Sequence, residues 1–433
     1  MTTATETPLA IKAATDAEAP VPTVKEKEAQ GIMARLGRWL ERDRWPTPAD
    51  TLALFSARLT DVAANKLAKQ WSLRYSQADA TERRVLLAGL AQASASLEPR
   101  GDQGLRLFRR LYAQADSLKL LVELRADILR WRKQVAGLGV LERELEGLLS
   151  SWFDVGMLEL RPINWDSPAS LLEKLIQYEA VHEIRSWEEL RHRVADQRRC
   201  YAFFHPRMND VPLIFVEVAF AAQMAADVQV LLDPHVPAED PSKARWAIFY
   251  SISNTQPGLR GISFGNFLLK RVIDELLREL PKLKSFATLS PIPGFADWLS
   301  KQDGQAMQAL LHDKADKQQA LDDPQAGQKW VERLQAAATG KAPDAVQRTG
   351  LRLVAHYLKG MKNGQPLDPV ARFHLGNGAR IERVNWAADR SPKGLAQSCG
   401  IMTNYLYELD QLDDNLAQLA AGKPKTGLNL RWL

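Results

Sequence analysis

The chain has 433 residues, of which 45% are hydrophobic and 25% charged, and its formal net charge is +5. This length predicts about two or three domains, and the composition excludes a disordered or fibrous protein. The small basic excess gives no sign of a nucleic-acid groove. Only two cysteines, Cys200 and Cys399, are present, which excludes a disulfide framework and a cysteine-rich metal site.

Residues 1–31 are rich in Ala, Thr, Glu and Pro without hydrophobic periodicity, which predicts a disordered tail. The segment has neither the apolar core of a signal peptide nor the arginines of a transit peptide, so we expect a cytoplasmic protein. No apolar run approaches the roughly 18 residues that a membrane-spanning helix needs. We therefore expect no membrane partner and no nucleic-acid partner.

Residues 32–155 predict an all-helical domain. Apolar residues recur at helical spacing from Leu52 to Val62, and again at Leu105, Phe108 and Leu111. Strand patterns are missing from this stretch of the sequence. Its arginine-rich segments are interpreted as solvated helix faces, and we assign them no function.

Residues 156–433 predict an α/β domain. Short β-rich runs at 157–163, 200–204, 211–219 and 246–252 alternate with helices, and Asn209-Asp210 is typical of a hairpin turn, which favours a mixed sheet. Residues 298–362 predict a helical insertion. Strands are expected to resume at 372–375 and 379–385, and residues 394–422 are expected to close the chain as helix.

A strand, a glycine-containing loop and a helix follow one another between Trp246 and Leu277. Gly258, Gly261 and Gly265 let the backbone approach a ligand closely, and the next helix offers its free amides to an anion. These features predict a pyrophosphate cradle, although a plain tight turn explains the glycines equally well.

The same loop contains Gly261-Ile-Ser263-Phe-Gly265, which matches the nucleophile elbow of α/β-hydrolases. Ser263 would be the nucleophile, with Asp297 and His374 available in the right chain order. An elbow needs a sharp strand-to-helix turn, whereas residues 254–260 separate the strand from the first glycine. A thioesterase or other hydrolase is therefore the less favoured hypothesis.

Two further residues are candidates for catalysis. Ser290 ends a short strand and precedes a turn held by Pro291 and Pro293, which would present its hydroxyl with little positional freedom. His374 would lie on the polar face of its expected strand. The competing interpretations are that the serine only caps the next turn and that the histidine is a surface residue, as histidines opposite an apolar face more often are. No histidine spacing predicts a metal site.

Several blocks of the second domain resemble the malonyl-CoA decarboxylase family. They are residues 199–205, 249–253, 256–261, 289–295, 373–379, 385–389 and 398–405. The resemblance implies a helical N-terminal domain that assembles the protein as a dimer of dimers. It also implies a catalytic domain of the GNAT acetyltransferase fold, so that the expected fold class is α+β.

The resemblance also implies site residues. Ser290 and His374 would be the catalytic pair, with Tyr407 near the thioester. The loop after the fourth strand would hold the pyrophosphate of coenzyme A; its residues are Arg260, Gly261, Ile262, Ser263, Phe264, Gly265 and Asn266. Animal members of the family carry an acidic residue where this chain has Ser263, so that residue's role is not transferred.

The expected reaction converts malonyl-CoA to acetyl-CoA and carbon dioxide through an enolate, without a metal or organic cofactor, because the thioester itself accepts the electrons. His374 would protonate the enolate and Ser290 would polarise the substrate, although this division of roles is left open. An acyltransferase on the same fold, and a helical scaffold that binds coenzyme A without chemistry, are the competing hypotheses.

Overall fold

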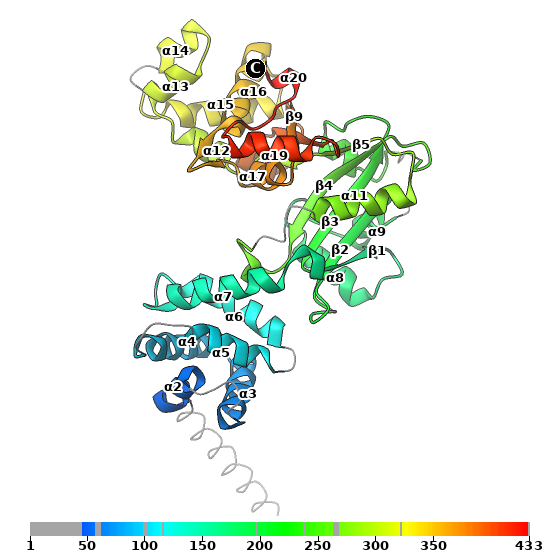
Figure 1. Ribbon diagram of the computed structural model, residues 1–433. Coiled ribbons are helices and arrows are strands. Elements are labelled where there is room, and N and C mark those ends of the chain that lie inside the picture. Colours follow the sequence, from blue (N-terminus) through cyan, green and yellow to red (C-terminus); the bar gives the residue numbers. More distant parts are fainter. Residues whose placement is uncertain are drawn as a thin grey trace, which may run out of the picture.

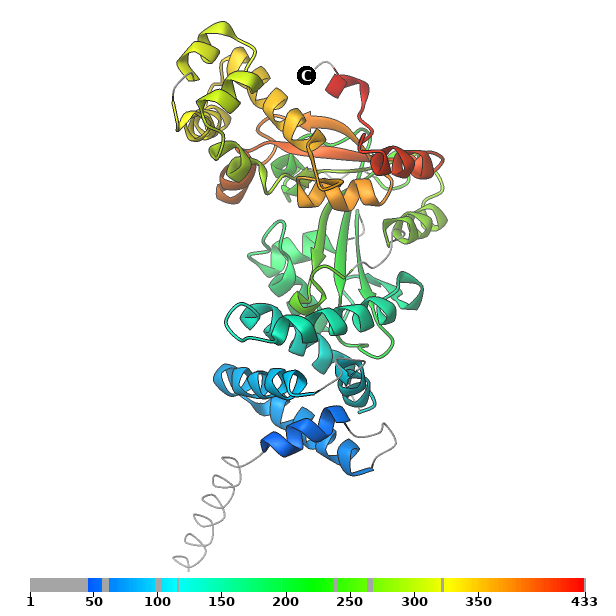
Figure 2. The same cartoon turned by 60° about the vertical axis from the view of Figure 1, so that its left-hand side comes forward.

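The structure is a computed structural model that describes residues 46–56, 62–97, 103–114, 117–195, 197–236, 240–262, 268–320 and 323–431. The molecule is elongated, with a helical unit at one end, a sheet in the middle and a second group of helices at the other end (Figures 1 and 2). The tail expected at residues 1–31 lies outside the described residues.

Among the described residues, six helices form the first unit and lie mostly side by side (Figure 1). They are α2 (Pro48–Ser56), α3 (Val62–Gln77), α4 (Ala80–Ala95), α5 (Gln103–Tyr112), α6 (Ser117–Trp131) and α7 (Leu138–Trp152). Trp71, Tyr75 and Phe108 are fully buried among them. The expected repeat from Leu52 to Val62 crosses residues 57–61, which lie outside the described residues, and Val62 opens α3 with its side chain exposed.

Eight strands of the described chain form the central sheet. In spatial order they are β1 (Glu159–Ile163), β2 (Arg198–Phe204), β3 (Ile214–Ala221), β4 (Trp246–Asn254), β5 (Ser285–Thr288), β10 (Met402–Tyr407) and β6 (Ser290–Pro291), with β9 (Arg380–Asn385) also on β10. The β4–β5 pair is parallel and the other pairs are antiparallel. The mixed sheet and the β2–β3 hairpin are therefore confirmed.

Helix α11 (Leu268–Glu279) makes the crossover from β4 to β5, so a fourth strand is followed by a loop and a helix, as the resemblance implies. Shorter elements complete this part: η1 (Val155–Met157), α8 (Ala169–Tyr178), α9 (Trp187–Arg193), α10 (Val228–Leu232) and η2 (Pro257–Leu259).

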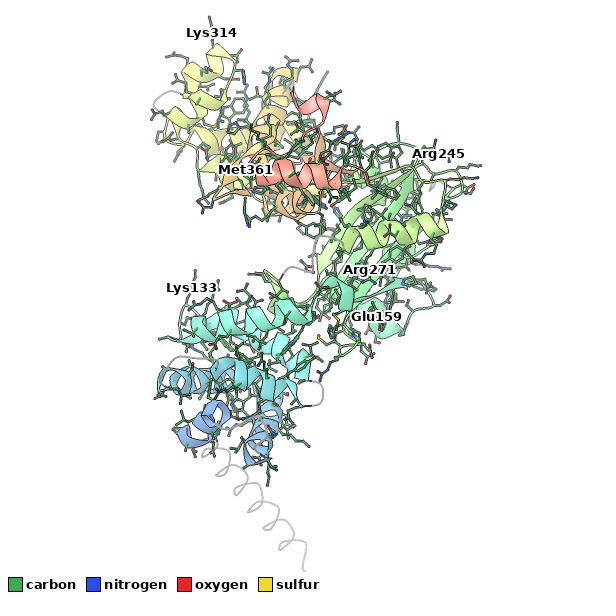
Figure 3. All side chains as sticks on the ribbon, in the orientation of Figure 1. Lys133, Glu159, Arg245, Arg271, Lys314 and Met361 are labelled. Atoms are coloured by element: carbon green, nitrogen blue, oxygen red, sulfur yellow. The ribbon has the colours of Figure 1, made fainter. Side chains whose placement is uncertain are left out.

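Helices fill the segment in which an insertion is expected. They are α12 (Phe295–Ser300), α13 (Gly304–Leu310), α14 (Lys314–Ala320), α15 (Ala326–Thr339) and α16 (Asp344–Lys359), followed by the small hairpin β7 (Met361–Lys362) and β8 (Gln365–Pro366). Figure 3 shows Lys314 and Met361 within this end of the molecule, above the sheet. The chain then continues through α17 (Pro369–Gly376), α18 (Pro392–Ser398), α19 (Leu412–Ala420) and α20 (Leu428–Arg431).

Two expectations for the C-terminal part are wrong. Residues 372–375 belong to helix α17, because Asp368 accepts hydrogen bonds from the amides of Val370 and Ala371 and Pro369 fits the first helical turn. Residues 402–407 are strand β10 and not helix. All six residues of β10 are buried between neighbouring strands, which removes the alternation that marks a half-exposed strand.

Strands β4 and β5 diverge at the centre of the sheet. They pair from Trp246 opposite Ser285 to Phe249 opposite Thr288, after which β4 continues to Asn254 paired with β3 only. A bulge occurs at the same point, because Tyr250 has no partner in the register with β3. Within the described chain, the divergence leaves one edge of β4 without a neighbouring strand.

Candidate active site

A cavity of about 580 Å³ opens where β4 leaves β5. One wall is the free edge of β4 and the segment that follows it, and the opposite wall is helix α17. Strand β6 closes the inner end with Ser290 and Pro291. The lining also includes Val181, Ile214, Gln256, Leu259, Ile262, Leu268, Pro369, Val370, Arg372, Phe373, His374 and Asn377.

Ser290, His374 and Tyr407 meet at the inner end of this cavity. The Ser290 Oγ lies 3.2 Å from His374 Nε2, and His374 Nδ1 lies 2.8 Å from the hydroxyl of Tyr407. The structure thus brings together three residues that the resemblance selected. Helix α17 places the histidine, because Ala371, His374 and Leu375 form its buried face. The predicted surface position of His374 is wrong: its exposed fraction is 3%.

The hydrogen bonds define which protons this group holds. The Ser290 hydroxyl donates to Thr288 Oγ1 at 2.8 Å, so its oxygen can accept from Nε2–H of His374. Burial raises the pKa of Tyr407 far above its usual value, so its hydroxyl stays protonated and can donate to Nδ1. Burial also lowers the pKa of His374 to about 3. The imidazole is therefore neutral at physiological pH.

Residues around the pair hold it in place, and sequence reasoning missed them. Tyr405 stacks on the His374 ring with 4.6 Å between ring centroids, and its amide donates to Thr288 Oγ1. Asn404 donates to the carbonyl of Thr288 at 2.7 Å. Both residues belong to the block 398–405 that resembles the family. Their contacts could have been predicted only if this block had been assigned to a strand instead of a helix.

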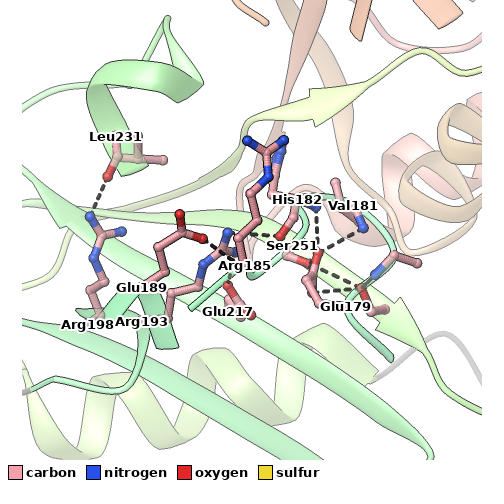
Figure 4. Close-up of polar contacts among 12 residues, drawn as sticks. Glu179, Val181, His182, Arg185, Glu189, Arg193, Arg198, Glu217, Leu231 and Ser251 are labelled. Carbon is pink, nitrogen blue, oxygen red and sulfur yellow. Dashed lines mark hydrogen bonds and ion pairs between the residues drawn. The ribbon is translucent and has the colours of Figure 1, made fainter. Parts of the chain in front are cut away.

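A buried carboxylate fixes another wall of the cavity. Glu179 accepts hydrogen bonds from the hydroxyls of Ser251 and Ser253 on β4 and from the amides of Val181 and His182 (Figure 4). Val181 lines the cavity, so Glu179 joins this loop to the free edge of β4. Glu179 belongs to no recognisable motif in the sequence, so its contacts with β4 become evident only in the folded structure.

Deeper in the same region lie buried ionisable groups (Figure 4). Arg193 pairs with Glu217 at 2.9 Å and donates to the carbonyl of His182. Burial lowers the pKa of His182 to about 4. Burial raises the pKa of Glu217 to about 7, against the opposing effect of Arg193. These groups make the stability of the fold depend on pH.

We expect the free energy of unfolding to fall as the pH drops from about 6.5 towards 4. In this range the unfolded chain protonates its histidines while buried His182 and His374 stay neutral, so acid favours unfolding. Glu217 opposes this trend, because its raised pKa removes stability as the pH rises from about 4.5 to 7. Urea unfolding at several pH values should show a shallower acid slope for His182→Asn than for wild type. Equal slopes would contradict the assignment.

Replacing Tyr407 by phenylalanine is expected to lower kcat about tenfold, because His374 Nδ1 loses its donor and a buried hydrogen bond of this kind contributes about 1 kcal/mol or more. KM should change little. Tyr405→Phe is the matched control, since the Tyr405 hydroxyl has no hydrogen-bond partner among the residues that the structure describes. Steady-state kinetics of both variants test this, and equal losses would contradict it.

The outer end of the cavity carries positive charge. Arg260, Gly261 and Ile262 of the predicted cradle line the cavity, and Arg372 of α17 lines it from the other side. Ser263, Phe264, Gly265 and Asn266 lie outside the described residues. Arg260 and Arg372 are both exposed and can meet an anionic ligand.

The described residues do not assemble a hydrolase triad. Asp297 lies on α12, where its exposed carboxylate pairs with Lys301 at 2.6 Å. The ring nitrogens of His374 contact Ser290 and Tyr407 instead. His374 therefore has neither the acidic partner nor the orientation that an elbow mechanism requires.

The described residues hold no candidate metal cluster, no helix that could span a membrane and no disulfide. Within them, no group of three or more His, Cys, Asp or Glu side chains could hold a metal ion. No helix of that part of the chain is long and apolar enough to cross a membrane. Cys200 and Cys399 are both buried and free.

Comparisons with known proteins agree with the resemblance. The model of the malonyl-CoA decarboxylase C-terminal domain matches residues 156–424, and that of the N-terminal domain matches residues 64–153. A solved malonyl-CoA decarboxylase from Cupriavidus metallidurans is 51% identical, with a TM-score of 0.79 over 89% of this chain and 98% of that one. One from Rhodopseudomonas palustris is 38% identical, with a TM-score of 0.76 over 89% of this chain and 98% of that one.

Curated relatives are similar over a smaller share of their length. The mitochondrial malonyl-CoA decarboxylase of Anser anser anser is 38% identical over 72% of this chain, and that of Rattus norvegicus is 39% identical over 71%. The matched region spans 65% and 66% of those two proteins. Since the family models together cover most of the sequence, the chain belongs to the malonyl-CoA decarboxylase family.

Proposed function

We propose that this protein converts malonyl-CoA to acetyl-CoA and carbon dioxide. The observation that supports this most strongly is the buried, neutral His374 paired with Ser290 at the inner end of a cavity whose outer end is cationic. Such a site can take the acyl end of a coenzyme A thioester inside and leave the phosphates outside. Family membership supports the same substrate.

The free edge of β4 fits the middle of the substrate. Within the described chain, residues 251–254 have no strand neighbour on the side of the cavity, so their peptide groups are open to hydrogen bonds there. The pantetheine arm of coenzyme A carries two amides, which can pair with such an edge as an added strand would. The phosphates would then lie near Arg260 and Arg372, the exposed cations that line the cavity.

The main requirement of the decarboxylation is that the site stabilises the negative charge of the enolate. The carbon–carbon bond breaks, its electron pair moves into the thioester as an enolate, and carbon dioxide leaves. Nε2–H of neutral His374 and the Ser290 hydroxyl, which in the free site face Ser290 Oγ and Thr288 Oγ1, can turn to the thioester oxygen and stabilise the negative charge that develops there. Burial at the inner end of the cavity disfavours the departing carboxylate. One proton is taken up at the enolate carbon, so the net reaction consumes a proton.

The neutral state of His374 refines the division of roles. With its pKa near 3, the ring holds no second proton at pH 7, so it acts as a donor through Nε2–H and not as an imidazolium acid. Water then supplies the proton for the enolate carbon through the Ser290 hydroxyl, which takes a proton from water as it gives its own, so that serine and histidine both end the step neutral. Deuterium from solvent should appear at the methyl group of acetyl-CoA.

The test is incubation of metal-stripped pure protein with malonyl-CoA while acetyl-CoA and carbon dioxide are followed. Stoichiometric release of both is the expected result. Free coenzyme A without carbon dioxide would favour a hydrolase, and a requirement for an amine would favour an acyltransferase. Tight binding of coenzyme A without any product would leave a binding protein and overturn the proposal.

Three further properties stay predictions. They are a cytoplasmic location, a homotetramer built as a dimer of dimers, and independence of metal and organic cofactors. Light scattering on the purified chain measures the assembly. Activity after chelation measures the last of these.

A further inference from the structure

The segment that leads from β4 to α11 rests on the helical unit. Its short helix η2 packs directly against α6, and Figure 1 shows it reaching the cyan helices below the sheet. Gly258 makes this approach possible, because a Cβ added there would overlap the carbonyl oxygen of Val122. The two units therefore meet backbone to backbone at this point.

Arg125 of α6 joins the two sides. One of its terminal nitrogens donates to the carbonyls of Gly258 and Arg260 at 2.7 and 2.8 Å. The other donates to Glu142 of α7 at 2.8 Å and lies 3.4 Å from Glu146. The Arg125 side chain is 2% exposed, so its charge is buried and compensated by Glu142. A planar guanidinium suits this double role better than a lysine would.

The carbonyls that Arg125 holds belong to the wall of the cavity. Arg260 is one of the two residues whose carbonyls Arg125 contacts, and Leu259 lies between them. Both residues line the cavity at the end where phosphates are expected. A shift of this backbone would move Arg260 and Gly261 relative to α17. The position of the outer wall thus depends on a side chain from the helical unit.

We propose that the helical unit is part of the coenzyme A site, with Arg125 as a positioning residue that fixes the backbone of residues 258–260. This inference rests on the proposed function, because it takes a coenzyme A thioester as the ligand. The helical unit then has a role in substrate affinity besides any role in assembly. Loss of Arg125 should weaken binding while the Ser290–His374 pair, at the other end of the cavity, keeps its geometry.

The test uses two variants of the full-length protein. Arg125→Lys keeps a cation beside Glu142 but cannot bridge both carbonyls and the carboxylate. The double variant Arg125→Met/Glu142→Gln removes both buried charges together, which avoids leaving one unpaired. Lys133→Ala is the control, since Lys133 is an exposed cation just beyond α6 (Figure 3). Thermal melting verifies that each variant is folded.

Calorimetric titration with coenzyme A and steady-state kinetics with malonyl-CoA give the readout. We expect Kd and KM to rise about tenfold or more in both folded variants, as the loss of charge-assisted hydrogen bonds implies, with kcat within about twofold of wild type. Unchanged Kd and KM, or a fall in kcat alone, would overturn the inference. Because Kd is measured without turnover, wild type that binds coenzyme A but releases no carbon dioxide would refute the proposed function alone.

Discussion

Replacing His374 by alanine is expected to lower kcat for malonyl-CoA by about 10²–10³, the usual contribution of a fixed hydrogen-bond donor at a developing oxyanion. The change removes Nε2–H, which faces Ser290, and opens a void beside Tyr405. KM should change little, because the outer end of the cavity, where most of coenzyme A would bind, is untouched. Acetyl-CoA formation under saturating substrate measures the loss.

His356→Ala is a useful control for this experiment. His356 lies on α16 and stacks on Trp298, outside the cavity, so its removal should leave kcat near the wild-type value. Near-normal turnover of folded His374→Ala would remove the histidine from the mechanism. An equal loss in His356→Ala would point to instability instead.

Ser290→Ala is expected to lower kcat by about 10²–10³, which is the effect of losing one fixed donor at a developing oxyanion. The Ser290 hydroxyl contacts both Thr288 and His374. Its removal therefore also leaves Nε2–H of His374 without its acceptor. Ser300→Ala on α12 provides the control, because that hydroxyl donates to a carbonyl of its own helix. A rise in KM without loss of kcat would show that Ser290 serves binding alone.

The double variant Ser290→Ala/His374→Ala adds a test of the pair. Two residues that act on the same atoms should not lose activity independently, so the double variant should be little slower than His374→Ala. A product of the two single effects would indicate separate roles, for example one on the carboxylate and one on the thioester.

Much of this fold could be predicted from the sequence, because helical spacing and short β-rich runs report local burial. The N-terminal helical unit, the β2–β3 hairpin and the mixed sheet are examples. The wrong secondary-structure predictions fall on two elements whose sequence pattern does not report their burial in the fold. Strand β10 is buried on both faces and shows no alternation, and α17 is too short for its period to stand out against the apparent alternation of Phe373 and Leu375.

The site could be predicted in part. Ser290 was recognisable from the two prolines that follow it, and the resemblance supplied His374 and Tyr407. The contacts of Glu179 with β4, and of Arg125 with residues more than 130 positions later, could not be read from the sequence, because nothing local marks either residue. Single charged residues gain a structural role only after the chain has brought distant segments together.

Strand β10 has a consequence for how the protein is made. It lies between β5, β6 and β9, all of which precede it in the chain, and it carries Tyr407. During synthesis these strands leave the ribosome with unpaired edges, which are prone to pair with other chains until β10 arrives. A nascent chain of this architecture acquires its finished sheet and its catalytic hydrogen bonds in the same late step.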